Sequence, residues 1–533
     1  MIHNHRMLVS ASTNPNVNTI DKNVLKQLLN KEIVYRHKAI RIIAEICKEE
    51  TQRKECISYD FFTPLIDIFE TGTLQEQIES CRAVGNMCYE NSDGCELMDK
   101  SIGLQRLLDL CRISCKTNDK EGAQLRMMTL GALHNIVNSN EYENLLSSRF
   151  LFSIGDTLSE SVIYENRAIL LPYFLEAAEE DSMKAELCSS SLYFKLITLC
   201  EQYAGKDEEF LRETCYILIL LITTDKAIDH LLSRPERDLL ECGIKWLETD
   251  NLQLNMTGAL IITNLTRNDQ AATGILLDAR QPHLKLVQRL QLFSSQLQNQ
   301  LASMSDEQAK VAHGVLGALR NLAVPKSNHV LLINNDVADV VIPYMFSRHF
   351  DGEIAYKATG VLRFLLREAK ETTKLSLFDD KILTQIVENG NAHHLGLQFE
   401  ARRVLFLMPI ALRTTDAIKA MARTNSFPLI LSTIASCEVQ NRSLVQNEAL
   451  VALNIILIMS DENVRQKLIE ANFHESVKQF LNQDIQHDEV INNILQMIHL
   501  VQKYDQFLTS EQILEYGPLL QKLRASQNSS KDI

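Results

Sequence analysis

The sequence predicts an all-α protein, an armadillo/HEAT-type right-handed superhelical solenoid of about ten to twelve repeats. Three observations predict this fold. Glycine and proline contribute only 18 and 10 of the 533 residues, and this scarcity of turn residues disfavours sandwiches, barrels and nucleotide-binding sheets. Short runs of small and apolar residues leading into an Asn recur along the chain. Their spacing, mostly in the forties, is typical of armadillo and HEAT repeats. The clearest copies are RAVGNMCYEN (82–91), GALHNIVNSN (131–140), GALIITNLTRND (258–269) and GALRNLAVPKSN (317–328).

Each copy predicts the last helix of one repeat. A helical hairpin or trio cannot bury its apolar face alone, so repeats stack, and small residues before the Asn allow close approach of neighbouring backbones. The last helix of each repeat should then line a concave groove. A final apolar segment, VINNILQMIHLVQ (490–502), is expected to cap the array. With the Asn as a ruler, equivalent helices fall near Glu45, Asn86, Asn135, Phe174, Leu220, Asn264, Asn321, Phe364, Leu407 and Asn454.

The array is predicted to run without a domain linker over residues 20–524. Residues 1–19 are expected to be disordered, and residues 525–533 (ASQNSSKDI) form a polar tail. The step from Asn264 to Asn321 is longer than the other steps. It therefore predicts an insertion at about residues 285–308, made of a lengthened helix and a loop.

Charge and cysteine content narrow the classes of partner and compartment. The formal net charge of −14 disfavours nonspecific binding to nucleic acid or anionic membranes and favours a basic protein partner. The 12 cysteines form no CxxC pair and read as buried thiols in a reducing cytosol. We see no signal peptide, and the longest apolar run, 215–222, is too short for a membrane span. We expect a cytosolic protein.

Sequence motifs of catalysis are missing. The sequence contains no GxxxxGK[ST], GxGxxG, HExxH or GxSxG, and no Cys/His cluster at metal-ligand spacing. His393 and His394 are adjacent, which on a helix sends them to different faces. We therefore expect no catalytic residue, metal or cofactor, and a chain that binds partners rather than transforms substrates.

Acidic residues recur after the groove-lining helices of the N-terminal half. Repeat stacking would align them along one edge, where a basic tail could bind. The alternative is an ordinary solvated surface. The residues are Glu90, Asp93, Glu141, Glu143, Glu176, Glu179, Glu180 and Asp181.

A central polar group and an apolar group are further candidates. The polar group comprises Asn264, Arg267, Asn268, Asn321 and Asn328. A ladder Asn can point into the groove and hold a bound backbone through its amide, or it can bond to a neighbouring repeat. Both alternatives remain open for each position. Where the Asn is absent, an apolar residue stands in and could floor a hydrophobic pocket or pack on a neighbour; these residues are Phe174, Leu220, Phe364 and Leu407.

From about residue 75 to 460 the sequence resembles the Smg GDP-dissociation stimulator family, armadillo-repeat regulators of small GTPases. The resemblance lies in RAVGNMCYENSDG, LCRISCKTND, NLQLNMTGALIITNLTRND, GVLGALRNLAVPKSN, YKATGVLRFLL and VQNEALVALN, in that order. The short step from Asn135 to Phe174 is similar to the family's shorter form, which lacks one N-terminal repeat. The insertion before Ser305, the N-terminus and the C-terminus depart from the family pattern.

The resemblance implies a monomer that binds Rho-, Ras- and Rap-type GTPases with polybasic, prenylated C-termini. It also implies promotion of GDP release, chaperoning in the cytosol, and presence with partners at the endoplasmic reticulum, mitochondria or nucleus. The family's GTPase-facing residues would fall on Asn264, Arg267, Asn268, Asn321, Asn328 and Arg363. The prenyl pocket would lie near Met87, Cys88, Leu133, Ile136 and Val137.

The rival class is an armadillo scaffold or import-type adaptor that binds basic peptides without exchange activity. Such adaptors place a Trp four residues before the ladder Asn, where it stacks on lysine stems. Here those positions hold Arg82, Gly131, Leu260 and Gly317, and the single tryptophan, Trp246, precedes no ladder Asn at that spacing.

Overall fold

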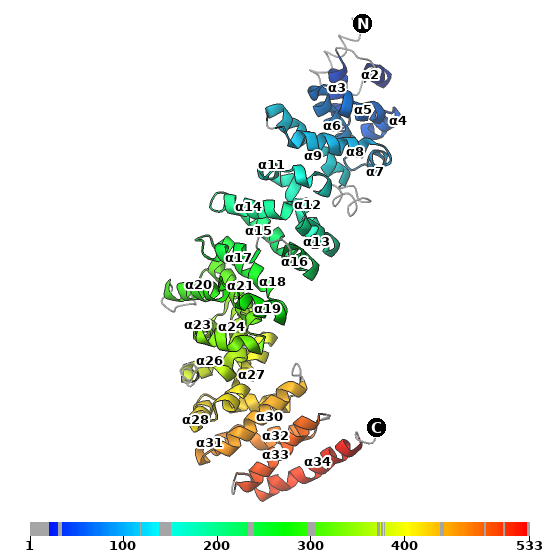
Figure 1. Cartoon of the computed structure of the whole chain (residues 1–533). Coiled ribbons are helices and arrows are strands. Elements are labelled where there is room, and N and C mark those ends of the chain that lie inside the picture. The colour runs from blue at the N-terminus through cyan, green and yellow to red at the C-terminus, as the bar shows by residue number, and fades with distance from the viewer. Residues whose placement is uncertain are drawn as a thin grey trace. The chain divides into compact units, whose positions relative to one another are not determined.

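The structure is a computed structural model of the whole chain. It describes residues 21–29, 35–117, 119–137, 151–232, 239–296, 304–369, 374, 377, 379–436, 442–483, 487–504 and 507–529, with side chains 232, 442 and 522–529 excepted. Within these ranges every regular element is helical (Figure 1). The predicted all-α armadillo fold is confirmed. The predicted disordered N-terminus, 1–19, lies outside the described residues.

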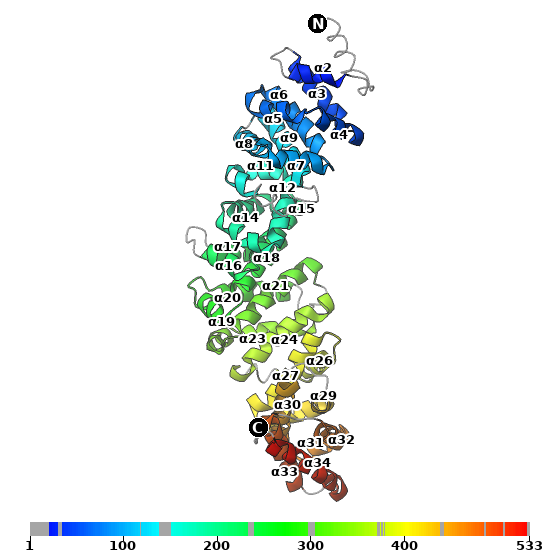
Figure 2. The same cartoon turned by 90° about the vertical axis from the view of Figure 1, so that its right-hand side faces the viewer.

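The chain forms two compact units, Met1–Asp238 and Leu239–Ile533. Each unit is described by itself below, and the expected continuity of the array across residue 238 stays a prediction. Figure 2 gives a second view of the helices in both units.

The first unit consists of helical trios and pairs, each ending in a long helix that we call the third helix of its repeat. Its third helices are α3, α6, α9, α12 and α15. Its bounds are α2 (Lys22–Leu29), α3 (Arg36–Ile46), α4 (Glu50–Ser58), α5 (Phe62–Thr71), α6 (Leu74–Cys88), α7 (Ser92–Lys100), α8 (Gly103–Cys115), α9 (Lys120–Val137), η2 (Gly155–Thr157), α11 (Glu160–Glu165), α12 (Arg167–Glu179), α13 (Asp181–Ser189), α14 (Leu192–Tyr203), α15 (Glu208–Leu221) and α16 (Asp225–Leu232).

The second unit repeats this pattern with third helices α18, α21, α24, α27, α30 and α33. Its bounds are α17 (Leu239–Leu247), α18 (Leu252–Leu265), α19 (Asp269–Leu276), α20 (Pro282–Gln296), α21 (Asp306–Leu322), η4 (Lys326–Asn328), α22 (His329–Asn334), α23 (Val337–Val341), η5 (Ile342–Phe346), η6 (His349–Gly352), α24 (Glu353–Leu365), η7 (Leu366–Glu368), α26 (Asp380–Gly390), α27 (Leu395–Leu412), α28 (Thr415–Arg423), α29 (Ser426–Ala435), α30 (Arg442–Met459), α31 (Glu462–Glu470), α32 (Phe473–Leu481), α33 (Asp488–Lys503) and α34 (Ser510–Ser529).

All ten ruler positions fall on third helices, and the expected capping segment is α33. The small residues that precede the ruler positions let the third helices of successive repeats pack closely. A Cβ placed on Gly85 of α6 would lie 3.0 Å from the Ala132 Cα of α9, so glycine permits this close approach. Helix α6 begins at a capping box in which Thr73 and Glu76 satisfy each other's backbone N–H groups.

The ends and the insertion differ in detail from a simple repeat. Helix α20 runs to Gln296, within the expected insertion, and residues 297–303 lie outside the described residues. Helix α34 runs to Ser529, so part of the segment predicted as a polar tail is helical. Ten of the eleven cysteines that the structure describes are buried. None of the described helices is long and apolar enough to cross a membrane.

Candidate functional site

Three ladder asparagines bond to the preceding repeat. The side-chain amides of Asn86, Asn135 and Asn321 donate to the carbonyl oxygens of Ala44, Gly85 and Thr263 at 2.9, 2.9 and 3.0 Å. In each case the acceptor lies one residue before the ruler position of the preceding third helix. Of the two alternatives for these side chains, the inter-repeat bond is the one observed, and it fixes the register between successive third helices.

Two ladder asparagines differ: Asn454 donates to the Asn493 carbonyl of the following repeat at 3.1 Å, and Asn264 forms no such bond within the described chain. Asn264 is half-buried on α18, and among the described residues its amide makes no hydrogen bond. Arg267 and Asn268 follow it at the end of α18 and are exposed. The side-chain Oδ1 of Asn268 accepts from the backbone N–H of Ala271 at 2.8 Å and caps α19. Asn264 therefore keeps a free amide on this part of the second unit's third-helix face.

Two residues assigned by resemblance are committed to the fold. Asn328 is only 1% exposed, and its amide donates to the Leu322 carbonyl at 2.9 Å. Its amide closes the turn after α21, so burial disfavours the predicted GTPase-facing role, which stays a prediction. Arg363 of α24 binds the carboxylate of Glu400 and stacks on Phe364 at 3.9 Å, and burial lowers the pKa of its guanidinium.

Glu400 of α27 is the centre of a buried ion cluster. Its side chain is 2% exposed and binds Arg363 through one oxygen and Arg320 of α21 through the other, the latter at 2.9 Å. Arg320 also lies over the ring of Tyr356 at 5.0 Å. This cluster joins α21, α24 and α27 along the third-helix face of the second unit.

The six acidic candidates that the structure describes are all exposed, and their positions on the helices separate them. Asp93 and Asp181 lie in the first turns of α7 and α13, where a carboxylate interacts favourably with the helix dipole. Glu176 and Glu179 lie in the last turn of α12, where the dipole disfavours a carboxylate. Helix stability can explain why Asp93 and Asp181 are acidic, but it cannot explain Glu176 and Glu179. Glu180 follows directly as the N-cap of α13, and Glu141 and Glu143 lie outside the described residues.

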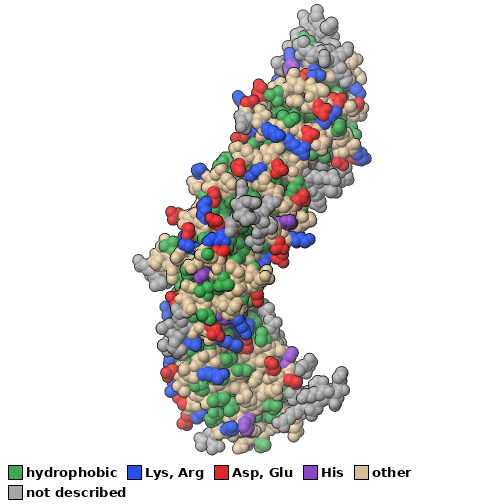
Figure 3. Space-filling view, in the orientation of Figure 1, with side chains coloured by type: hydrophobic (Ala, Val, Ile, Leu, Met, Phe, Trp, Pro, Cys, Tyr) green, Lys and Arg blue, Asp and Glu red, His purple; other side chains and the backbone are tan. Residues whose placement is uncertain are grey.

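Glu90 is a further acidic residue at an unfavourable place. It follows α6 with φ at 46°, a left-handed conformation that costs free energy for a residue other than glycine. In the view of Figure 3, acidic and basic side chains are interspersed over the surface rather than gathered into one field.

The five residues predicted near a prenyl pocket are inter-repeat core. Met87, Cys88, Leu133, Ile136 and Val137 are all buried, on α6 and α9. None of the five is among the residues that line the pocket described below. Of the apolar residues that replace the ladder Asn, Phe174 and Leu407 are buried, and Leu220 and Phe364 are half-buried.

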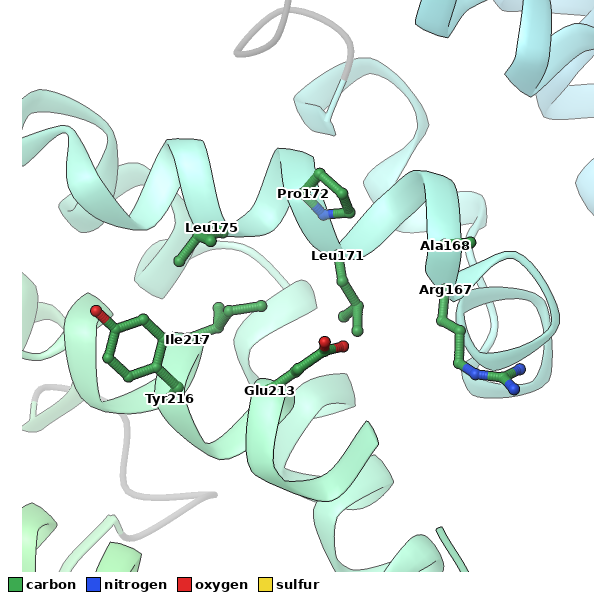
Figure 4. Close-up of a pocket in the computed structure, with 8 residues that line it drawn as sticks. All are labelled: Arg167, Ala168, Leu171, Pro172, Leu175, Glu213, Tyr216 and Ile217. Atoms are coloured by element: carbon green, nitrogen blue, oxygen red, sulfur yellow. The ribbon is translucent and has the colours of Figure 1, made fainter. Parts of the chain in front are cut away.

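An open apolar pocket lies elsewhere in the first unit, between α12 and α15. Its volume is about 270 Å³. Figure 4 shows Leu171, Ile217 and Glu213 reaching into the space between the two helices. Tyr216, on the rim, is 55% exposed. The full lining comprises Arg167, Ala168, Leu171, Pro172, Leu175, Glu213, Tyr216 and Ile217.

One of the residues that line this pocket is a proline, Pro172, which lies inside α12 and has no N–H to donate to the carbonyl of Ala168, four residues earlier. The pocket combines apolar walls with two charged side chains, Glu213 and Arg167. The proline inside an apolar helix was the sequence signal that could have located it.

Trp246 does not serve a peptide groove. It is fully buried in α17, so its ring cannot stack on the lysine stems of a bound peptide. In the part of the chain that the structure describes, no group of three or more His, Cys, Asp or Glu side chains could hold a metal ion.

Comparisons with known proteins place these features in context. No family model matches the chain. The chain is 24% identical over 554 residues to Rap1 GTPase-GDP dissociation stimulator 1-B of Xenopus laevis, covering 94% of this chain and 88% of that protein. It is 23% identical over 570 residues to GTPase-GDP dissociation stimulator vimar of Drosophila melanogaster, covering 89% and 87%.

A solved structure from a study of the interaction between cadherin and beta-catenin has the same fold. It aligns with a TM-score of 0.58 and 13% identity over 94% of this chain and 96% of that one. The resemblance inferred from the repeat segments is confirmed by the curated proteins, which match beyond those segments. The chain is an all-α armadillo-repeat protein related to the GTPase-GDP dissociation stimulators.

Proposed function

We propose that this protein binds small GTPases and stimulates the release of their GDP. The observation that carries the proposal is the similarity to GDP dissociation stimulators over about nine-tenths of the chain. The sequence holds no phosphate-binding loop of its own. The protein therefore acts on the GTPase by differential affinity, because a ligand shifts an equilibrium only as far as it binds one state more tightly.

The third-helix face of the second unit is the proposed contact for the GTPase domain. Asn264 offers an amide that no described neighbour uses, and Arg267 lies exposed beyond it. An amide can donate to and accept from an extended backbone at once. These groups would hold a nucleotide-contacting segment of the GTPase in a displaced conformation, and so favour the GDP-free state.

The first unit is the proposed site for the GTPase's C-terminal tail. Glu176 and Glu179 lie on α12 beyond the pocket, and Glu179 is eight residues from Leu171, or about 12 Å along the axis. A prenyl group in the pocket would thus place a neighbouring basic segment beside these carboxylates. Holding both would let the protein chaperone prenylated GTPases in the cytosol.

The proposed exchange activity is tested by Asn264→Ala. Loss of an amide that contacts the partner only in the displaced state should slow stimulated release of fluorescent GDP from a Rho protein by roughly three- to tenfold, which corresponds to about 0.5–1.5 kcal/mol. Asn321→Ala is a poorer test, because it also removes the bond to Thr263. Asn482→Ala, an exposed amide at the end of α32, is the matched control. Unchanged release in Asn264→Ala would mean that this face is wrongly assigned, and binding without any release would identify a scaffold.

The acidic residues of α12 should govern the rate of association. Reversing Glu176, Glu179 and Glu180 to Lys should slow association with a GTPase bearing a lysine-rich tail more than it speeds dissociation, because charges at the rim steer encounter. The wild-type rate should fall steeply with salt, since exposed charges are screened over about 8–10 Å.

Unfolding of α12 does not explain such a loss for Glu176 and Glu179, and circular dichroism checks the fold for Glu180, the N-cap of α13. Lysines in the last turn of α12 favour the helix dipole, so each reversal there should stabilise the fold by about 0.3–1 kcal/mol. Asp99→Lys, exposed on α7, is the matched control. Stopped-flow association at several salt concentrations measures the effect, and a rate indifferent to salt would contradict it.

A further inference from the structure

In the second unit, α21 and α24 each carry a cationic side chain that packs against a glycine of the other helix. A Cβ added to Gly317 of α21 would lie 3.3 Å from the Lys357 Nζ of α24, and a Cβ added to Gly360 of α24 would lie 2.6 Å from the Arg320 Nε of α21. The arrangement is reciprocal, since each helix supplies one cation and one glycine. A side chain at either glycine would crowd the cation that lies against it. The two glycines therefore provide the space in which Lys357 and Arg320 lie.

The two cations differ in their partners. Arg320 pairs with Glu400 at 2.9 Å. The Lys357 ammonium donates only to neutral groups, the His313 Nδ1 and the His313 carbonyl, both at 3.3 Å. Among the described residues no carboxylate pairs with it. Glu353, one turn earlier on α24, is occupied instead by His394, whose Nε2 lies 2.9 Å from its carboxylate.

The surroundings oppose the charge of Lys357. Burial lowers the pKa of its ammonium to about 8; the Glu353 carboxylate acts in the opposite direction, and Arg320 adds a smaller lowering effect. Burial and the neighbouring ammonium lower the pKa of His313 to about 4, so this imidazole is neutral near pH 7 and can accept from Lys357. A half-buried ammonium with only neutral partners is costly, and a carboxylate from outside would relieve that cost.

A strained rim borders the same place. Phe350, Asp351 and Gly352 follow one another with φ at 54°, 52° and 99°, although only glycine adopts this region readily. Phe350 is 38% exposed and meets the His313 ring edge-on, with the ring centroids 6.1 Å apart. Such strain is retained where a function requires it, and here it holds an aromatic ring at the edge of the Lys357 site.

We propose that Lys357, beside Arg320, is a docking point for a carboxylate side chain of the bound GTPase. The inference rests on the proposed function and adds a specific contact to it. One unpaired ammonium matches one carboxylate. A phosphate dianion would demand a second free cation or a guanidinium fork, and the guanidinium of Arg320 is already engaged by Glu400.

The test uses the full chain and a GTPase trimmed of its C-terminal tail, so that the first unit's acidic residues and pocket contribute nothing. Affinities are measured by calorimetric titration at pH 7 and pH 9 for the wild type, Lys357→Arg and Lys357→Met. If only the charged ammonium binds, wild-type affinity falls about tenfold between the two pH values, because the charged fraction falls through its pKa of about 8. Lys357→Arg stays charged and should bind equally at both.

Lys357→Met should bind about tenfold more weakly than the wild type at pH 7, with no further loss at pH 9. The other titratable and charged groups around Lys357 are unchanged in all three proteins, so their contribution cancels in the comparison. These groups are His313 and Arg320 on α21, Glu353 on α24, His394 at the N-cap of α27, and Glu400 on α27. Circular dichroism checks the fold of each variant.

The carboxylate itself is identified by a double-mutant cycle. Asp→Asn and Glu→Gln variants of the GTPase are titrated against wild type and Lys357→Met, and one of them should weaken binding to the wild type alone. Equal affinities of wild type and Lys357→Met at both pH values would overturn the inference and leave the proposed function standing. Absence of binding by the wild type to the trimmed GTPase and to the full-length prenylated GTPase alike would overturn both. Displacement of the GTPase by inorganic phosphate from the wild type, and not from Lys357→Met, would overturn the carboxylate in favour of a phosphate.

Discussion

Replacing Glu400 by alanine is expected to lower the free energy of unfolding of the second unit by about 3–5 kcal/mol. The carboxylate is almost fully buried and holds two guanidiniums, those of Arg320 and Arg363, from two different helices. Removing it leaves both cations without their shared counter-charge, and breaking a buried pair from one side is among the costliest single changes. Few surface substitutions in this unit should approach that effect.

The measurement exploits the single tryptophan. Trp246 is buried within the second unit, so its fluorescence during urea unfolding follows that unit alone. Glu388→Ala is the matched control, since its pair with Arg348 spans 3.2 Å with both side chains more than half exposed, and exposed pairs contribute about 0–1 kcal/mol. The triple variant Arg320→Met, Glu400→Met and Arg363→Met should recover most of the loss. Equal effects of Glu400→Ala and Glu388→Ala would show that the cluster adds no stability.

The positions of the repeats along the chain could be predicted because each third helix carries a local sequence pattern. An Asn after a run of small residues identifies a third helix wherever it occurs, and the packing of Gly85 on Ala132 shows why those residues are small. The direction of each Asn could not be predicted, because it depends on whether the preceding repeat presents a carbonyl within reach. Asn321 donates to the Thr263 carbonyl of α18, whereas Asn454 donates to the Asn493 carbonyl of the following repeat.

The candidate sites were less predictable, because residue type alone does not reveal burial or helix position. Asn328 matches its motif and is buried by a turn that forms only when α21 ends. Ile136 has the apolar character of a lipid contact and faces the neighbouring repeat. Lys357 lies in the segment YKATGVLRFLL, but that segment does not reveal its site, which also depends on Gly317 of another helix. The acidic residues of α12 were found by recurrence, and only their place in the last helical turn separates them from Asp93.

A prenylated basic peptide is expected to bind at least about a hundredfold more tightly than the same peptide without its lipid, and Leu175→Asp should remove most of that difference. Each buried CH₂ contributes about 0.8 kcal/mol, so burial of only four or five carbons between α12 and α15 supplies more than 3 kcal/mol. Exposed ion pairs contribute about 0–1 kcal/mol each. The lipid should therefore set the affinity, and the carboxylates of α12 the rate of association.

Leu175 is the position to change because it is half-buried at the pocket, where an aspartate places its charge in the lipid's path without entering the core. Ile136→Asp would be misleading, since Ile136 is fully buried and the variant would unfold. The matched control is Ile113→Asp on α8, an isoleucine of the same unit that is 61% exposed and outside the pocket. Titration of both peptides into the three proteins decides the matter. Equal affinities of the two peptides for the wild type would exclude a lipid site, whereas a lipid preference that survives in Leu175→Asp would move the site away from α12 and α15, with the core around Met87 and Val137 opening to receive the chain.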